Sequence, residues 1–389
     1  MHKVTSLTVI LLSVLLLTAC TSQQSTALPQ NSSNGTTSPT NTSEESPVAV
    51  GYKVEVYADS LFVPWSIVFT SADRVLVTER SGAVKVVEKG VVRKEPMITF
   101  DVSTRSEDGL LGMTLDPNYA SNKYVYIAYT YASGRGADRV VRAVDEGDKL
   151  RVDKTLIEGV PAAQVHAGSR LKFGPDGKLY MTTGDASQKE LAQDKTSLAG
   201  KILRMNSDGS IPSDNPFPNS YVWSYGHRNP QGIDWHPVTK TMWETEHGPS
   251  GGDGPGGGDE VNMIERAANY GWPVVSHDKR RDGMMDPQVL YTPAIAPGSG
   301  SFYTGKVFPQ FENNFFYGAL RGQGIYRAVL NTDGTNVLSH NKLAGVDVGR
   351  VRDVVTGPDG NIYFSSSNRD GRGSVKDKDD KIYRLVPAK

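Results

Sequence analysis

The chain has 389 residues, and its 42 lysines and arginines nearly balance its 43 aspartates and glutamates, which gives a formal net charge of −1. Proteins that bind nucleic acid usually present a basic surface, so this balance argues against nucleic acid as a partner. Cys20 is the sole cysteine, so no disulfide supports the fold, but a chain of this length can bury a large core without one.

The first twenty residues predict an export signal. Lys3 is followed by an apolar run that ends at Ala19, shorter than the roughly 20 residues that span a bilayer. The letters LTAC at 17–20 match a lipobox, in which the cysteine is lipidated after cleavage. The alternative is an ordinary signal peptide, but the single cysteine stands where the lipobox requires one. We therefore expect residues 1–20 to be a lipoprotein signal peptide and Cys20 to anchor an exported protein at the cell envelope.

Residues 21–50 are rich in Ser, Thr, Asn and Pro and contain almost no bulky apolar side chain. Such a segment cannot bury enough surface to offset its chain entropy, so we predict a flexible linker. The folded domain is then expected to cover residues 51–389, with the lipid anchor as its only link to a membrane.

From residue 51 onward, strand-like patterns dominate, and one unit recurs six times. Each copy is a turn, often Pro-Asp-Gly, followed by a strand with alternating bulky residues. Comparable strand positions are Leu76, Val125, Leu179, Met242, Phe315 and Ile362. Their separations of 49, 54, 63, 73 and 47 residues suit a four-stranded propeller blade with its loops. We predict an all-β, six-bladed β-propeller rather than a long β-sandwich or two β domains, with the chemistry on loops around the central channel.

The third repeat contains the first candidate for catalysis. His166 precedes one predicted strand, and Asp185 follows the next. The two ends of a hairpin meet at one rim, so the carboxylate could orient the imidazole as a general base. A solvated loop histidine is the alternative.

A second candidate lies between aromatic residues in the segment WSYGHRNPQ. Arg228 and Asn229 could bind an anionic or carbonyl-bearing ligand through charge-assisted hydrogen bonds. The alternative is a surface loop in which Arg228 lies over Trp223 or Tyr225.

Further arginines occur at the ends of later strands. Arg350 and Arg352 are two residues apart, so on a strand both side chains leave the same face. They would repel each other unless an anion lay between them, or else they would form a solvated strand edge. Arg321 directly follows another repeated strand. Together the arginines predict a small polar ligand with more than one carboxylate.

Residues 246–262 read EHGPSGGDGPGGGDEVN and suggest a cation site. Glycine and proline let backbone carbonyls turn inward, and Asp259 and Glu260 would supply charge, which suits Ca²⁺. No His/Cys cluster with zinc spacing occurs in the sequence. The Gly-Pro pair occurs twice, at 248–249 and at 254–255.

These segments together resemble the soluble pyrroloquinoline quinone (PQQ)-dependent sugar dehydrogenases, the glucose/aldose sugar dehydrogenase family, over roughly residues 63–384. The motifs that carry the resemblance are VPWSIVF, EDGLLGMTLDPNY, HAGSRLKFGPDGKLYMTTGD, LAGKILRMNSDGSIPSDNPF, YGHRNPQGIDWHP, DEVNMIERAANYGWP, IAPGSGSFY and GRVRD. Each motif alone is a weak signal, but all of them in order on a six-fold repeat are specific.

The resemblance implies a six-bladed propeller that oxidises the C1 hydroxyl of an aldose to the lactone and passes electrons to an external acceptor. It implies that His166 is the general base and that Asp185 orients its imidazole. Arg228 would contact the quinone with Asn229 and stabilise developing negative charge. The remaining residues assigned to the cofactor are Arg321, Arg350, Arg352 and Glu107.

The resemblance also implies two calcium ions. The carbonyls of Gly248 and Pro249 would hold the quinone-bound Ca²⁺, a Lewis acid, although the second Gly-Pro pair stays an alternative. Glu260 and the carbonyl of Tyr270 would hold a second, structural Ca²⁺.

The sequence departs from the family at two positions near the catalytic pocket. Val165 stands where the best-known glucose oxidisers have an aspartate that contacts the sugar, so we expect a broad aldose specificity. Glu107 stands where some members have a neutral amide.

Three other classes of protein compete with this interpretation. A calcium-dependent lactonase-type propeller would need several acidic or amide side chains on its ion and no arginine cluster. A non-catalytic ligand-binding propeller would be expected to lack the base or the cofactor arginines. The eight-bladed quinoprotein alcohol dehydrogenases depend on adjacent cysteines, which this chain does not have.

Overall fold

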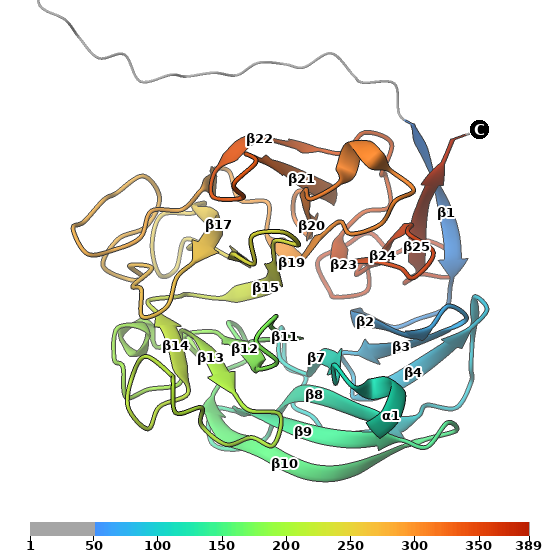
Figure 1. The fold of residues 1–389 in the computed structure, drawn as a ribbon, viewed down its shortest axis with the longest axis horizontal. Helices are drawn as coiled ribbons and strands as arrows, with labels where there is room; N and C mark the ends of the chain where they lie inside the picture. The colour runs from blue at the N-terminus through green and yellow to red at the C-terminus, as the bar shows by residue number, and fades with distance from the viewer. Residues whose placement is uncertain (1–50, 389) are drawn as a thin grey trace, which may run out of the picture. The chain divides into compact units, whose positions relative to one another are not determined.

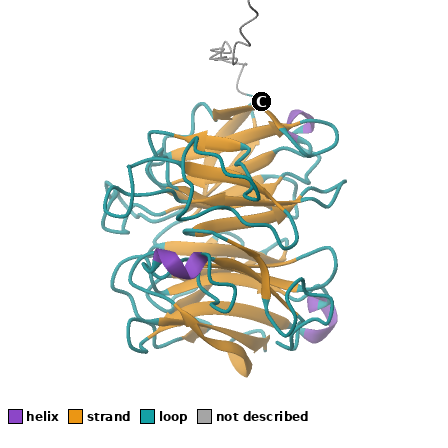
Figure 2. Cartoon of the chain, turned by 90° about the vertical axis from the view of Figure 1, so that its left-hand side faces the viewer, coloured by secondary structure: helices purple, strands orange, loops and turns teal. Residues whose placement is uncertain are grey.

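The computed structural model describes residues 51–388, which form six β-sheets with very little helix. Figure 1 shows the sheets arranged as blades around a central axis, so the predicted six-bladed propeller is confirmed. In the view at right angles to it, loops gather along the two faces of the ring (Figure 2). The expected signal peptide and linker lie outside the described residues.

The first three blades follow one another along the chain. Blade 1 contains β2 (Pro64–Ser71), β3 (Arg74–Glu79), β4 (Ala83–Glu88), β5 (Val91–Val92) and β6 (Ile98–Thr99), the last also paired with β4. Blade 2 contains β7 (Leu110–Leu115), β8 (Tyr124–Tyr131), β9 (Ala137–Asp145) and β10 (Leu150–Pro161). Blade 3 contains β11 (Gly168–Phe173), β12 (Leu179–Thr183), β13 (Lys201–Met205) and β14 (Val222–Tyr225).

The next two blades repeat this order, and the last one differs. Blade 4 contains β15 (Pro230–Trp235), β16 (Met242–Glu246), β17 (Asp259–Ile264) and β18 (Val289–Tyr291). Blade 5 contains β19 (Pro297–Phe302), β20 (Phe315–Ala319), β21 (Gly324–Leu330) and β22 (Val337–Lys342). Blade 6 combines β23 (Val351–Thr356), β24 (Ile362–Ser366) and β25 (Ile382–Pro387) with β1 (Tyr52–Ala58) from the start of the domain.

The ring is therefore closed by both ends of the described chain. β1 pairs antiparallel with β25, with Tyr52 opposite Pro387 and Ala58 opposite Ile382. The first strands of neighbouring blades contact one another all the way around, including β23 with β2. Closure leaves no inner strand edge free to pair with another chain.

The repeat found in the sequence matches a fixed place in every blade. Its six reference positions all lie on the second strand, namely β3, β8, β12, β16, β20 and β24, and all are buried. The Pro-Asp-Gly turns join first and second strands, and Gly177 and Gly360 adopt the positive φ that the turn requires, at 71° and 81°.

The core lies between the blades rather than at the centre of the ring. A buried apolar cluster fills each of the six interfaces between neighbouring blades; the one between blades 4 and 5, for example, contains Trp243, Phe302 and Phe315. Apolar burial stabilises the face-to-face stacking of the sheets, and the stack is a rigid frame for the loops at the rim.

Helix is limited to α1 (Tyr119–Asn122), η1 (Lys189–Ala192) and η2 (Pro309–Phe311) within residues 51–388. In that range no helix has the length and apolar character needed to span a bilayer.

Candidate active site

A pocket of about 470 Å³ lies at one rim of the propeller. Its walls come mainly from loops that enter a first strand or follow a second strand in blades 2 to 6. Strand residues such as Trp65, Gln231 and Arg352 complete them. The residues that line the pocket include Glu107, Gly248, Pro249, Arg321, Arg350, Arg352 and Arg372.

His166 and Asp185 meet at the edge of this pocket, next to Ala167 and Gly168 in its wall. Nδ1 of His166 lies 2.7 Å from Oδ1 of Asp185. The other carboxylate oxygen accepts a hydrogen bond of 2.8 Å from Nε1 of Trp272. A neutral imidazole in this setting carries its proton on Nδ1, which leaves the lone pair of Nε2 available for a substrate proton.

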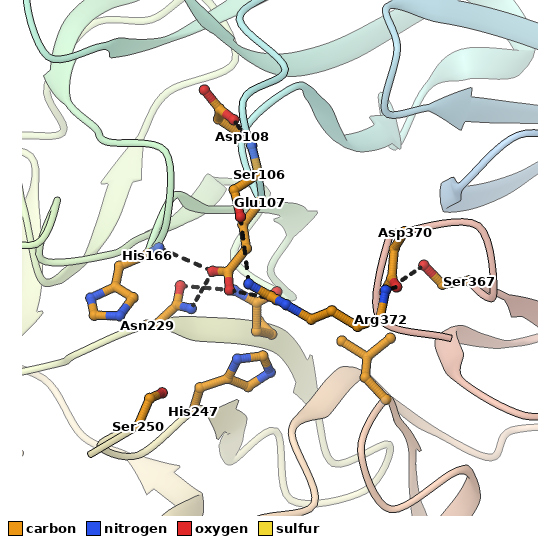
Figure 3. A network of polar contacts seen from close by, with 12 residues as sticks. Ser106, Glu107, Asp108, His166, Asn229, His247, Ser250, Ser367, Asp370 and Arg372 are labelled. Atoms are coloured by element: carbon orange, nitrogen blue, oxygen red, sulfur yellow. Dashed lines mark hydrogen bonds and ion pairs between the residues drawn. The ribbon is translucent and has the colours of Figure 1, made fainter. Parts of the chain in front are cut away.

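Glu107 lies between His166 and Arg372 and contacts both (Figure 3). Its Oε2 accepts hydrogen bonds from the His166 N–H at 3.1 Å and from Asn229 Nδ2 at 3.4 Å. Its Oε1 lies 3.0 Å from Nη1 of Arg372. Burial raises the pKa of Glu107, but the surrounding positive charges and the His166 N–H outweigh burial and hold the pKa below its usual range.

Arg228 is buried, with 2% of its surface exposed, so the surface-loop alternative is wrong. Its Nε lies 2.7 Å from Oδ2 of Asp253, and its Nη1 donates to the carbonyl of His247 at 3.0 Å. The ring that it faces belongs to Trp272, at 5.5 Å; Trp223 is instead covered by Arg204, at 5.1 Å.

Asn229 is also buried and is held by its neighbours. Its Oδ1 accepts hydrogen bonds from Gln231 Nε2 at 2.9 Å and from the Gly168 N–H at 3.3 Å. The amide therefore has a fixed orientation next to Glu107 and the start of β11.

Arg350 and Arg352 both line the pocket and are both more than 90% buried, so they do not form a solvated edge. Arg350 is paired with Asp370 at 2.7 Å and donates to the carbonyl of Leu320 at 3.1 Å. Arg352 donates from Nη1 to Gln231 at 2.7 Å.

Arg321, Arg350 and Arg352 form an arginine wall of the pocket, and two of them have N–H groups available to an anion. The Nε of Arg352 is buried without a partner among the described residues, and burial lowers the pKa of its guanidinium to about 9. Arg321 is exposed at the pocket and makes no ion pair within residues 51–388. A ligand with several carboxylates would satisfy both groups.

The first Gly-Pro pair is buried and lines the pocket, whereas the second does not line it and Pro255 is exposed. A Cβ at Gly248 would meet the carbonyl oxygens of Gly257 and Gly258 at 2.3 Å, so only glycine fits there. Pro249 accepts a hydrogen bond of 3.1 Å from the Gly257 N–H, which leaves one lone pair of its carbonyl.

The expectation that Asp259 supplies charge to a cation is not supported by its contacts. Oδ1 accepts the Gly248 N–H at 2.8 Å, and Oδ2 accepts the N–H groups of Ile295 and Ala296 at 2.7 and 2.6 Å. Three backbone donors already satisfy this carboxylate, so it shapes the loop instead.

Next to the pocket, β16 and β17 bring three carboxylates together inside the protein. Glu246 lies opposite Glu260 in the ladder, and Glu244 lies opposite Asn262. Nδ2 of Asn262 donates to both Glu244 and Glu260, each at 3.0 Å. Burial and the neighbouring carboxylates raise the pKa of Glu244, and raise that of Glu260 to about 8.

This acidic cluster has the donor set that a hard cation needs. Oε1 of Glu244 and Oδ1 of Asn262 are buried oxygen acceptors with no partner in the described part of the chain. Glu246 and Glu260 line a small cavity with Tyr270 and Pro249. Oxygen ligands without donors, in a site where carboxylates repel one another, fit Ca²⁺.

Of these residues, Glu260 and Tyr270 were predicted from the sequence, whereas Glu244, Glu246 and Asn262 were not. A signal was present, because both E-x-E at 244–246 and E-x-N at 260–262 put alternate side chains on one face of a strand. The pairing of β16 with β17 then brings these side chains together. Arg372 and Trp272 were also missed, since nothing near them in the sequence indicates contact with His166 or Asp185.

A family profile described as Glucose / Sorbosone dehydrogenase matches residues 61–383. The uncharacterized protein slr1608 of Synechocystis sp. is 36% identical over 354 residues, which cover 81% of this chain and 84% of that protein. Aldose sugar dehydrogenase YliI of Escherichia coli is 31% identical over 344 residues, covering 82% of this chain and 91% of that protein.

A solved structure supports the same relationship. The PQQ-bound aldose sugar dehydrogenase of Streptomyces coelicolor matches with a TM-score of 0.77 at 33% identity, over 88% of this chain and 99% of that one. The profile match and these full-length relatives agree with the pocket and the blade order described above. The chain belongs to the glucose/sorbosone dehydrogenase family.

Proposed function

We propose that this protein is a PQQ- and calcium-dependent dehydrogenase that oxidises the C1 hydroxyl of aldose sugars to lactones and passes the electrons to an external acceptor. The observation that carries the proposal is the His166–Asp185 dyad at the edge of a pocket that Arg321, Arg350 and Arg352 also line. The PQQ-bound state of a relative with 33% identity supports the choice of cofactor.

PQQ, when bound, supplies a quinone that accepts the hydride from C1. The arginine wall would hold its carboxylates, with the unpartnered Nε of Arg352 and the exposed Arg321 as the free donors. Arg228 and Asn229 would face the quinone oxygens; because both side chains are buried and hydrogen-bonded, they need little rearrangement to do so.

His166 would take the proton of the C1 hydroxyl on Nε2. The resulting imidazolium is stabilised by Asp185, which already holds Nδ1 at 2.7 Å and is itself oriented by Trp272. A carboxylate in this position fixes the tautomer of the ring and offsets the positive charge that proton transfer creates.

Calcium would occupy two places. The carbonyls of Gly248 and Pro249 would bind the ion next to the cofactor, where Ca²⁺ acts as a Lewis acid, and their burial in the pocket wall favours them over the second Gly-Pro pair. Glu260 and the Tyr270 carbonyl would bind the second ion, with Glu244 and Asn262 as neighbouring oxygen donors.

Reconstitution tests the function directly. Purified protein is treated with a chelator, then given PQQ and Ca²⁺, and dye reduction is measured across a panel of aldoses. We expect turnover with several sugars, only when both additions are made. Absence of turnover with every sugar, together with no change in quinone absorbance, would sink the proposal.

The role of the base has its own test. His166→Gln is expected to lower kcat by at least about a hundredfold, the low end of what general-base catalysis contributes, while PQQ still binds. His340→Gln, on the outer strand of blade 5, serves as the matched control and should leave kcat unchanged. If His166→Gln abolished quinone binding instead, the base would be misassigned.

We also propose that residues 1–50 deliver the propeller to the cell envelope as a lipoprotein anchored at Cys20; the LTAC motif supports this. Cys20→Ala should release the protein from the membrane fraction and abolish labelling with a palmitate analogue. Membrane retention of that variant would contradict the anchor.

A further inference from the structure

Glu107 and Arg372, which both line the pocket, form an ion pair (Figure 3). Arg372 lies in the loop between β24 and β25 of blade 6, whereas Glu107 lies in the loop that enters β7 of blade 2. Nη2 of Arg372 also reaches Oγ of Ser106, at 3.4 Å. The contact therefore joins two blades that are not neighbours in the ring.

The two oxygens of Glu107 serve different partners. Oε1 accepts a hydrogen bond from Arg372, whereas Oε2 accepts hydrogen bonds from the backbone N–H of His166 and from the amide of Asn229. All three partners are donors, and only a carboxylate can accept from all of them. A neutral amide would turn its own N–H groups toward one of these donors.

His166 needs this support because of its backbone. Its φ of 59° is in the left-handed region, which is unfavourable for a residue with a side chain and persists only where surrounding contacts hold it. One such contact is the hydrogen bond from the His166 N–H to Glu107, and another is the side-chain bond to Asp185.

We propose that Arg372 is a positioning residue for His166 that acts through Glu107. Its guanidinium fixes the carboxylate that holds the His166 backbone, and it offsets the negative charge that this carboxylate places beside the imidazole. The inference deepens the proposed function and rests on it, because it takes His166 as the general base. Arg372 need not touch the sugar or the cofactor.

Other charges near His166 do not replace Arg372. Asp185 holds Nδ1 of the ring at 2.7 Å, and it is unchanged in the variants of Arg372 and Glu107. Asp253 is paired with Arg228 at 2.7 Å, so these two charges largely cancel.

His247 also lines the pocket with Glu107, but its Nε2 lies 2.9 Å from the Pro297 carbonyl, and it makes no hydrogen bond to Glu107 within residues 51–388. Arg372 is the cation that forms an ion pair with Glu107 within residues 51–388. Removing Arg372 exposes the ring to the negative charge of Glu107.

The test is the titration of the His166 imidazole by NMR in the full chain with isotope-labelled histidine, with the signal assigned through His166→Gln. Arg372→Met should raise the pKa of His166 by about 0.5, roughly a threefold gain in proton affinity, because a nearby negative charge favours the imidazolium. Glu107→Gln should lower the pKa of His166, since the positive charge of Arg372 then has no carboxylate partner. Arg372→Lys, which keeps the charge, should stay close to the wild type.

A matched ion pair controls for the loss of any arginine. Arg151 is paired with Glu146 at 2.6 Å and is 55% exposed, the same as Arg372, but lies on the outer strand of blade 2. Arg151→Met should leave the His166 titration within about 0.1 of the wild type. Arg372→Gln provides a second variant if the methionine disturbs folding.

Two results would overturn the inference: no shift in Arg372→Met, or shifts of the same sign in Arg372→Met and Glu107→Gln. In the reconstituted enzyme, the acidic limb of kcat/KM should rise in pH by the same amount as the NMR titration. The titration does not depend on turnover, so a protein that oxidises no sugar would refute the proposed function while the NMR result still decides the role of Arg372.

Discussion

Single side chains determine the charge of the acidic cluster beside the pocket. Glu244 and Glu246 are buried, the half-buried Glu260 lies opposite Glu246, and a divalent cation would relieve the repulsion among these carboxylates that His227 offsets only at Glu246. The pKa of Glu260 is about 8 without an ion, against an ordinary value near 4.3 for a glutamate in an unfolded chain.

Chelation should therefore lower the melting temperature, and more strongly at pH 8 than at pH 5. Between the two pKa values of Glu260, the folded state without the ion holds a proton that the unfolded state has released. Its stability then falls as pH rises, by up to about 1.4 kcal/mol per pH unit for this group. With Ca²⁺ bound the carboxylates are ionised and this loss disappears. A thermal melt series with and without chelator measures the difference, and Glu260→Gln should reduce it.

Gly248 gives a second prediction at this scale. Gly248→Ala forces a Cβ against two carbonyl oxygens and should weaken PQQ binding in the presence of Ca²⁺ by at least roughly tenfold, through displacement of the loop. Gly252→Ala, in the same loop but with open space around the new methyl group, is the control. Quinone absorbance titration reads both; equal affinities would favour the second Gly-Pro pair as the calcium ligand.

At the scale of elements, the loop between β12 and β13 shows how the position of Asp185 is secured. Lys201 begins β13 and is fully buried, and its Nζ donates to the carbonyls of Leu191, Ala192 and Ala199 at 2.7, 3.0 and 2.6 Å. Its ammonium group thus bonds the carbonyls at the end of η1 and in the turn that precedes β13.

Lys201→Met should destabilise the protein by about 1 to 3 kcal/mol, because the Ala199 carbonyl loses its donor, whereas the carbonyls of Leu191 and Ala192 each keep a backbone N–H. The same change should lower kcat, since the loop also carries Asp185. Lys154→Met removes one comparable bond, to the carbonyl of Asp208 at 2.8 Å, at an exposed site and should have little effect on either quantity. Denaturant midpoints and steady-state kinetics test both variants; an unchanged Lys201→Met midpoint would contradict the role of the ammonium group.

The elements also show what a sequence can and cannot predict. The second strand of every blade was located because Pro-Asp-Gly turns and alternating bulky residues are local signals. The rim position of His166 and Asp185 followed from one hairpin. Arg372 lies 265 residues from Glu107, and Glu244 acts only through the strand beside it, so ring closure and strand pairing decide their roles.

At the scale of the whole molecule, closure of the ring by β1 should be essential for stability. A chain that starts at residue 51 keeps every pairing of the propeller, whereas one that starts at residue 60 loses β1 and exposes the edge of β25. We expect the first to melt like the full chain and the second to melt several degrees lower and to aggregate. Thermal melts and size-exclusion chromatography compare the two; equal melting temperatures would show that the sixth blade is complete without β1.

The pairing of Tyr52 with Pro387 has a further consequence for engineering. Because the two ends of the described chain are register partners in one ladder, a short peptide could join them without moving any blade. New ends could then be opened in an exposed turn such as 146–149, between β9 and β10. The blade at which the chain begins is thus a matter of genetic order rather than of architecture, and a circular permutant could carry a fused domain at a blade other than blade 6.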